Sequence, residues 1–464
     1  MRRAKILATL GPASANADTL SALFRAGVDA VRLNFSHGTP DQHRANAALV
    51  RRVAGDVGRI VAILGDLSGP KIRTGTFASG PVELVPGARF VLTSEDVPGD
   101  VNSVSMTYPL ADDLVAGDVL LLDDGLLRLR VEEVRPPALI TRVEVGGPLS
   151  DKKGINVPGA KLKTAALTDK DKRDLALAKE IGVDYLALSF VRSAADILEC
   201  KALAGDIPVI AKLEKPEAVA QIDAIVEACD GLMVARGDLG VEMGSEKVPL
   251  VQKEAIRRIN RAGKLVITAT QMLDSMIRNP RPTRAEAADV ANAILDGSDV
   301  LMLSGESASG KYPIESVATM DSIIREVESS KLYASLPEPE LFGDYVHFGN
   351  ACARAVSSIS RSVNLAAIVV HSRSGRTASV LADYRPRAPI VAVTRDPHVA
   401  QRLALQWGLL PVIGDLEIAH DHAMERADEA ALRAVNAKSG DNIAVLLGSV
   451  SGDGERSVTM RNIR

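Results

Sequence analysis

Eight short apolar runs recur along the chain, and each ends in a small cluster of polar or charged residues. A helix-like stretch usually follows. Buried parallel strands read as near-continuous apolar runs because both faces of their sheet are covered. The runs are Lys5–Thr9, Ala30–Phe35, Ile60–Leu64, Tyr185–Phe190, Val209–Leu213, Gly231–Ala235, Leu265–Ala269 and Asp299–Leu303. Eight strand–helix units predict a (β/α)8 TIM barrel, and such barrels carry their chemistry at the carboxyl ends of the strands.

The barrel pattern is interrupted once. Between Thr74 and Gly159, Gly, Pro, Asp and Val dominate, helical periodicity is absent, and short alternating segments predict a small all-β insertion. It follows the third strand and therefore emerges at the catalytic end, where a lid would lie. The expected strands are Val82–Leu84, Arg89–Thr93, Val119–Leu122, Leu126–Val131 and Ile140–Val145.

A new strand–helix alternation begins at about Asp344 and predicts a doubly wound α/β domain. Its expected strands are Ala366–Val370, Ile390–Val393 and Ile443–Leu447, with helices at about 375–384, 397–407 and 417–437. We therefore expect residues 1–70 and 158–342 to form the barrel, 71–157 a small β-barrel lid domain, and 343–464 a C-terminal domain for effector binding and oligomerisation.

Composition excludes several classes of protein. A length of 464 residues predicts two or three domains. The 55 basic and 59 acidic residues leave a net charge of -4, which gives no indication of nucleic-acid or membrane binding. The three cysteines are scattered, as in a reduced protein, and no apolar run approaches the roughly 18 residues of a membrane span. Met1-Arg2-Arg3 leads directly into a strand and leaves no room for a signal peptide, so a cytoplasmic location is expected.

Two strand ends carry alternating polar side chains. Arg32, Asn34 and Ser36 share one strand face, so a cation and two neutral oxygen groups point together at the barrel mouth. Lys212 and Glu214 share a face in the same way. A structural ion pair is the alternative for the second pair, but charges at a barrel rim are more often functional.

Three further strand ends complete the polar rim. After Gly231–Ala235 comes Arg-Gly-Asp-Leu-Gly, whose glycines permit a sharp turn and whose amides, at a helix start, suit a carboxylate or phosphate. Asp238 and Glu214, from adjacent strands, are a suitable pair of ligands for one Mg²⁺, with substrate oxygens and water completing the shell. Thr268 and Thr270 end the seventh strand, and Ser304-Gly-Glu306 ends the eighth.

This set of groups indicates a reaction driven by electrostatics. Several cations surround one metal site, and no nucleophile has an adjacent base. Phosphoryl transfer fits, because it needs positioning and charge neutralisation more than covalent help. Two anionic substrates at about 5 Å and an effective dielectric near 20 repel by roughly 3 kcal/mol per unit pair. Arg32, Arg73, Lys212 and Mg²⁺ would offset that repulsion.

Long motifs across essentially the whole chain closely resemble those of the pyruvate kinase family, in the same order. They are 8–14 (ATLGPAS), 32–38 (RLNFSHG), 69–75 (GPKIRTG), 151–159 (DKKGINVPG), 233–240 (MVARGDLG), 269–272 (ATQM), 281–286 (RPTRAE) and 303–306 (LSGE). The resemblance implies Mg²⁺-dependent phosphoryl transfer from phosphoenolpyruvate to ADP, giving pyruvate and ATP in the last step of glycolysis. It also implies a homotetramer, and Mn²⁺ is a possible substitute for Mg²⁺.

The resemblance also implies roles for individual residues. Glu214 and Asp238 match the Mg²⁺ ligands, Lys212 the cation that stabilises the phosphoryl group, and Arg32 and Arg73 the arginines that contact phosphate. The amides of Gly237 and Asp238, with the hydroxyl of Thr270, match the pocket for the substrate carboxylate. Asn34, Ser36 and Asp66 match the monovalent-cation site, and Pro12, His37, Arg73 and Lys153 match the nucleotide site. Thr270, Ser304 and Glu306 are candidates for a water relay that protonates the enolate, and the sequence does not choose among these three.

One departure concerns K⁺. Family members that need K⁺ usually carry Thr-Lys-Gly-Pro-Glu after the aspartate of strand three, whereas Asp66 is followed here by Leu67-Ser-Gly-Pro-Lys71. Leu67 and Lys71 resemble the K⁺-independent branch, in which an ammonium supplies the charge of the ion; Thr74 is less typical of that branch. We expect K⁺ not to be required. The alternative is that Lys71 is a surface lysine at the lid hinge.

A second departure concerns the C-terminal domain. Ser372-Arg373-Ser374-Gly375-Arg376-Thr377 links a strand to a helix start, and hydroxyls with free helix amides make a phosphate cradle. The family places the phosphate of an allosteric effector here. Residues 447–450 (LGSV) lack the Trp-Arg pair with which some relatives hold a second phosphate. This favours a sugar monophosphate or AMP over fructose bisphosphate.

Two other functions compete with an active pyruvate kinase. A catalytically silent sensor would keep only the effector domain, but it would be expected to have lost some of Lys212, Glu214, Asp238 and Thr270. Another Mg²⁺-dependent barrel lyase or aldolase acting on enolpyruvate or pyruvate would have no use for the lid or for Arg73 and Lys153, because it holds no ADP.

Overall fold

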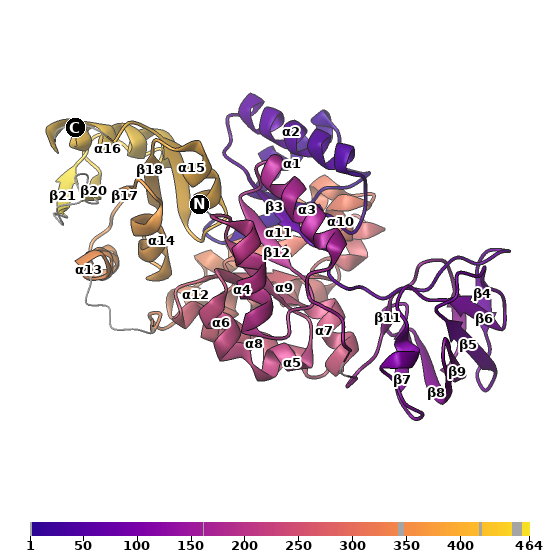
Figure 1. Cartoon of the computed structure of the whole chain (residues 1–464). Coiled ribbons are helices and arrows are strands. Elements are labelled where there is room, and N and C mark those ends of the chain that lie inside the picture. The colour runs from indigo at the N-terminus through magenta and orange to yellow at the C-terminus, as the bar shows by residue number, and fades with distance from the viewer. Residues whose placement is uncertain (1, 161, 342–347, 417–419, 448–456) are drawn as a thin grey trace.

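The chain folds into three parts, with the barrel between the lid and the C-terminal domain (Figure 1). This computed structural model describes residues 2–160, 162–341, 348–416, 420–447 and 457–464. Among them, no helix is both long enough and apolar enough to cross a membrane.

The predicted barrel is confirmed. Eight parallel strands close in the order β1-β16-β15-β14-β13-β12-β3-β2. They are β1 Lys5–Thr9, β2 Ala30–Asn34, β3 Ala62–Asp66, β12 Tyr185–Leu188, β13 Val209–Leu213, β14 Gly231–Ala235, β15 Leu265–Ala269 and β16 Val300–Leu303, each within two residues of a predicted run. Their side chains are almost entirely buried, as expected of strands with a filled interior and a helical cover.

Helices follow the barrel strands along the chain and surround them (Figure 1). They are α1 Ala17–Ala26, α2 Pro40–Asp56, α3 Asp169–Glu180, α4 Ala194–Ala204, α5 Pro216–Ala220, α6 Ile222–Ala228, α7 Arg236–Met243, α8 Val248–Arg261, α9 Arg284–Asp296, α10 Gly305–Ala308, α11 Pro313–Ser329 and α12 Lys331–Ala334. Capping boxes begin α3 (Thr168 with Asp171) and α9 (Thr283 with Glu286). Helix α7 begins directly after β14, so its first amides lie at the catalytic rim.

The insertion is an all-β unit with its own core. Its strands are β4 Val82–Leu84, β5 Arg89–Thr93, β6 Ser103–Ser105, β7 Val119–Leu122, β8 Leu127–Arg135, β9 Ala138–Val145, β10 Gly147–Leu149 and β11 Ile155–Asn156. They form a sheet of six in the order β11-β7-β8-β9-β5-β6 and a sheet of two, β10-β4. Neither sheet closes on itself, so the expected small β-barrel is present as two open sheets. One apolar cluster, which includes Phe90 and Leu92, joins them.

The C-terminal domain is a five-stranded sheet in the order β19-β18-β17-β20-β21, with only β21 antiparallel. Its elements are α13 Phe348–Ser362, β17 Ala367–His371, α14 Arg376–Asp383, β18 Ile390–Thr394, α15 Pro397–Ala404, β19 Leu409–Ile413, α16 His420–Val435, β20 Asn442–Leu447 and β21 Ser457–Asn462. The three predicted strands and helices are present, whereas β19 and β21 were not predicted. The expected domain border at 342/343, the expected helix start at 417 and residues 448–450 lie outside the described residues.

The C-terminal domain docks on the amino-terminal end of the barrel, opposite the catalytic rim. Leu405, just after α15, is fully buried among side chains of the barrel interior, including Leu7 and Tyr185. The Tyr185 hydroxyl donates to the Arg402 carbonyl at 2.9 Å, and Lys5 Nζ donates to the Leu409 carbonyl at 2.7 Å. The domain therefore closes the end of the barrel at which the strands begin, and the lid lies at the end at which the strands finish.

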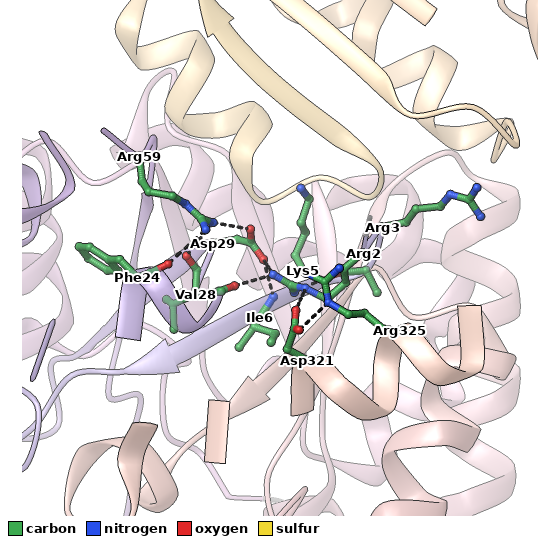
Figure 2. Close-up of polar contacts among 12 residues, drawn as sticks. Arg2, Arg3, Lys5, Ile6, Phe24, Val28, Asp29, Arg59, Asp321 and Arg325 are labelled. Atoms are coloured by element: carbon green, nitrogen blue, oxygen red, sulfur yellow. Dashed lines mark hydrogen bonds and ion pairs between the residues drawn. The ribbon is translucent and has the colours of Figure 1, made fainter. Parts of the chain in front are cut away.

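Buried ion pairs link the first segments of the barrel at the end where the strands begin (Figure 2). Asp29 accepts ion pairs from Arg2 at 2.6 Å and from Arg59 at 3.2 Å, and Arg2 also contacts Asp321 at 2.9 Å. Burial alone would raise the pKa of Asp29, but the neighbouring cations, Arg2 above all, hold that pKa below its ordinary value. The cluster is therefore electrostatically satisfied and acts as a structural support.

Candidate active site

A chain of charged groups links the ends of β2, β3 and β13. Arg32 Nε lies 2.5 Å from one carboxylate oxygen of Asp66, and Lys212 Nζ lies 3.3 Å from the other. Burial would lower the pKa of Lys212, but Asp66 and Glu214 outweigh it and raise that pKa. Lys212 is therefore a fixed cation, 10% exposed at its side chain, at the barrel mouth.

Glu214 and Asp238 are the carboxylates suited to a divalent cation. Glu214 Oε1 lies 2.9 Å from Lys212 Nζ, and its Oε2 accepts from the Phe190 amide at 2.7 Å. Burial, and then the nearby charge of Asp238, raise the pKa of Glu214, with Lys212 opposing them. Two carboxylates that repel each other in this way fit Mg²⁺, which typically takes one or two from the protein. Within the described residues, no group of three or more His, Cys, Asp or Glu forms a fuller metal site.

The first turn of α7 contacts Thr270. The Gly237 amide donates to Thr270 Oγ1 at 2.8 Å, so the predicted partners are brought together. Thr270 and Gln271 have φ of +69° and +53°, a conformation that costs energy for residues with side chains and is concentrated at functional sites. Arg236 holds this turn, donating to the Thr270 carbonyl at 2.7 Å and pairing with Asp289 at 2.6 Å.

Ser304 and Glu306, the other relay candidates, lie at the end of β16. The Glu306 side chain is buried, and its two oxygens accept from the amides of Leu273 at 3.0 Å and Ser304 at 2.7 Å. Ser304 Oγ is buried without a hydrogen-bond partner in the described structure. Glu306 thus holds the backbone at the end of β16 in place.

Four of the residues expected to bind monovalent cation or nucleotide follow β1 or end β2: Pro12, Asn34, Ser36 and His37. Asn34 Oδ1 accepts from the Ser36 amide at 3.1 Å, and Pro12 is exposed in the turn after β1. Burial lowers the pKa of His37, and the charges of Arg73, Arg32, Lys71 and Lys170 lower it further. These cations therefore make the surroundings of His37 electropositive.

The lid hinge carries the remaining predicted cations. Lys71 Nζ lies 3.4 Å from Asp238 Oδ1, so this lysine points into the site rather than lying on the surface. Arg73 donates to the Lys152 carbonyl at 3.1 Å, and Lys153 pairs with Asp123 at 2.8 Å. Arg73 and Lys153 thus lie in the two chain segments that connect the lid to the barrel.

The predicted effector loop lies far from this rim, between β17 and α14. Gly375 has φ +82° and precedes the helix, and no side chain caps the first amides of α14. Ser372 is buried, whereas Arg373, Ser374 and Arg376 are exposed and Thr377 is half-buried. Free amides beside these side chains are suited to an anion.

Sequence reasoning missed Ser189, which receives Lys212 Nζ at 2.7 Å and itself donates to the Leu67 carbonyl at 2.7 Å. Its only signal was its place near the end of the fourth predicted run, Tyr185–Phe190. Arg236 was noted in its motif, but not its role in holding the Thr270 turn, because Asp289 is distant in sequence.

The family description "Pyruvate kinase, barrel domain" matches residues 1–317, and "Pyruvate kinase, alpha/beta domain" matches residues 350–461. The chain belongs to the pyruvate kinase family. As such it is a phosphotransferase of glycolysis.

Relatives are found in several bacteria. The chain is 45% identical over 460 residues to the pyruvate kinase of Geobacillus stearothermophilus, covering 97% of this chain and 78% of the relative. It is 42% identical over 463 residues to that of Clostridium perfringens, covering 97% of this chain and 96% of the relative. It is 48% identical over 422 residues to pyruvate kinase 2 of Synechocystis, covering 89% and 71%.

Proposed function

We propose that this pyruvate kinase transfers the phosphoryl group of phosphoenolpyruvate to ADP with Mg²⁺ held by Glu214 and Asp238. The observation that carries the proposal is the continuous chain Arg32–Asp66–Lys212–Glu214 at the barrel mouth. It places two fixed cations beside Glu214, one of the two metal-suited carboxylates, and transfer between two anions requires such fixed positive charge. A silent sensor would not need to keep this chain intact.

The cations act on the phosphoryl group during transfer. Asp66 holds Arg32 and Lys212 through different oxygens, so both side chains are oriented before substrate arrives. Preorganised charge of this kind stabilises a transition state without reorganisation at the moment of reaction. Mg²⁺, when bound, would neutralise phosphate charge and polarise the transferring group; Mn²⁺ is suited to the same oxygens.

The first turn of α7 is the proposed carboxylate pocket of the substrate. The amides of Gly237 and Asp238 are at a helix start, where amides lack helical partners and the dipole favours an anion. Thr270 Oγ1 accepts from the Gly237 amide and must yield this amide, or share it, when a carboxylate enters. The same hydroxyl, with Ser304, is our candidate for delivering a proton to the enolate carbon, and Glu306 holds the Ser304 backbone in place.

ADP is proposed to bind between the barrel and the lid, against Pro12, His37, Arg73 and Lys153. The electropositive region around His37 supports this position. Lys71 is proposed to replace K⁺, because its ammonium already lies in the site, and both oxygens of Asp66 are engaged by Arg32 and Lys212. The monovalent-cation residues Asn34, Ser36 and Asp66 then form part of the wall without needing K⁺.

Regulation, assembly and location are proposed by family analogy. The loop Ser372–Thr377 is the proposed phosphate site for a sugar monophosphate or AMP, since its amides and side chains form one anion cradle. Strong activation by fructose bisphosphate and none by monophosphates would remove this assignment. A homotetramer and a cytoplasmic location complete the proposal.

The proposal is tested by following the ³¹P resonances of phosphoenolpyruvate and ADP in the presence of Mg²⁺, with the wild-type protein and with Glu214→Gln. We expect ATP to appear with the wild type, and far more slowly with the variant. Persistence of phosphoenolpyruvate with folded wild type, across pH 6–8, would favour the sensor. Its consumption without ATP would favour a lyase.

A further inference from the structure

Both chain segments of the lid hinge are attached to the same short helix of the barrel, α7. The outgoing segment contacts it through Lys71, 3.4 Å from Asp238. The returning strand contacts it through Asn156 in β11, whose Nδ2 donates to Glu242 Oε1 at 2.8 Å. Asp238 and Glu242 are four residues apart and therefore lie on one face of the helix.

Glu242 is a buried junction rather than a surface charge. Its side chain is 2% exposed, and the same Oε1 that accepts from Asn156 also lies 2.6 Å from Lys215 Nζ. A carboxylate at this depth is costly unless paired, so Lys215 and Asn156 are the partners that make its burial tolerable. Removing Lys215 leaves the carboxylate without a counter-charge, and removing Asn156 leaves it one hydrogen bond short. Either change favours movement of the helix or the lid.

Lys215 extends the junction to the other metal-suited carboxylate. It follows Glu214 directly in the chain, and its ammonium lies 5.8 Å from the centre of the Phe190 ring. The Phe190 amide, in turn, donates to Glu214 Oε2 at 2.7 Å. Phe190 also limits the hinge, because a side chain at Gly69 would meet its ring at 2.7 Å.

A hollow lies directly at this junction. It is lined on the lid side by Lys71, Ile155 and Asn156 and on the barrel side by Phe190, Arg192 and Lys215. Arg192 reaches across, donating to the Leu162 carbonyl at 2.8 Å and to the Thr164 carbonyl. The space allows the hinge to shift, while the polar contacts define where it rests.

We propose that Glu242 is a positioning residue that couples the angle of the lid to the metal site, through Asn156 on one side and Lys215 on the other. It touches no reacting atom. It holds α7, and therefore Asp238 and the first amides of the helix, in the position that the lid hinge sets. The proposal rests on the assignment of Glu214 and Asp238 as metal ligands.

The coupling is tested on the full-length protein without substrates, using Mn²⁺ binding measured by electron paramagnetic resonance. Residues that orient metal ligands typically change metal affinity by about 10–100-fold. We therefore expect Glu242→Gln to weaken Mn²⁺ binding about tenfold or more. Asn156→Leu, which alters only the lid, should weaken it about fivefold or more if lid and metal are coupled. Glu246→Gln, at an exposed position after the same helix, should leave Mn²⁺ affinity unchanged.

Hydrogen exchange supplies the second readout. Coupling is reciprocal, so Mn²⁺ should slow amide exchange over residues 154–160 in the wild type and do so less in Asn156→Leu. Wild-type Mn²⁺ affinity in Asn156→Leu and Glu242→Gln, with weak binding in Asp238→Asn, would overturn the coupling alone. Wild-type affinity in Asp238→Asn would instead remove the metal assignment. If Glu242→Gln does not fold, Asn156→Leu still decides the matter.

Discussion

The ammonium of Lys71 lies 3.4 Å from the carboxylate of Asp238, although the two residues are 167 positions apart in sequence. The contact brings a cation from the lid hinge to the mouth of β14, beside the proposed metal site. A diffusible cation would need its own ligands here, whereas Lys71 is delivered by the fold. On our proposal, this one side chain supplies the positive charge that K⁺ would otherwise bring.

Reversing the charge of Lys71 should create a K⁺ requirement. Lys71→Glu removes the ammonium and adds a carboxylate near Asp238, so we expect turnover in K⁺-free buffer to fall about tenfold or more, about 1.4 kcal/mol in the barrier. Added KCl should restore much of it. Lys311→Glu, an exposed barrel lysine, is the matched control. Equal loss with and without KCl would contradict the replacement role.

Lys212 should act mainly in the transition state. Lys212→Met should lower kcat by about 10²–10³-fold while changing KM for phosphoenolpyruvate much less, because the ammonium stabilises charge that develops during transfer. The variant also leaves Asp66 and Glu214 with one cation fewer, so its melting temperature should fall. Steady-state kinetics on protein shown to be folded by circular dichroism measure both effects. A rise in KM with unchanged kcat would assign Lys212 to ground-state binding instead.

Leu405 should hold the C-terminal domain to the barrel. Leu405→Ala leaves a cavity in the barrel interior, and such truncations cost about 2–5 kcal/mol. Urea denaturation followed through Trp407, which is buried against the barrel helices, reports the loss. Leu250→Ala, at a side chain that is 73% exposed, should change the free energy of unfolding little. Similar values for both variants would mean that the barrel end tolerates the cavity.

Asp383 should make stability depend on pH. Burial, reinforced by the charge of Asp299 and opposed by Arg385, raises the pKa of Asp383 to about 8. A carboxyl with a raised folded-state pKa contributes stability below its unfolded pKa of 3.8, and loses it as pH rises through about 8. Asp383→Asn should therefore gain stability over the wild type as pH rises from 5 to 9. Denaturant titrations at these pH values, with exposed Asp18→Asn as control, measure the difference; a constant difference would contradict it.

Much of the fold follows from local patterns. Barrel strands such as β14 are buried on both faces, so their apolar runs mark them within two residues. Strand β19 escaped prediction because Pro411 interrupts its pattern, and an edge strand tolerates that proline. Strand β21 is partly exposed and polar, so its sequence resembles a loop.

The positions of polar residues at strand ends predicted which side chains meet at the barrel mouth, but not the pairings that involve the lid. Alternation placed Lys212 and Glu214 on one face, and the barrel then brought Arg32 and Asp66 to them. The link from Asn156 to Glu242 spans 86 residues and depends on how the lid sits on the barrel. Such contacts between domains are set by the docking of two surfaces, which no local pattern encodes.

The most direct test of the account is pyruvate formation from phosphoenolpyruvate, ADP and Mg²⁺ in buffer free of K⁺ and Na⁺, repeated with added KCl. Similar turnover in both conditions is the predicted result, because Lys71 supplies the charge that K⁺ would bring. Turnover only with KCl would contradict the role of Lys71 while keeping the kinase. No turnover in either condition would contradict the proposed reaction itself.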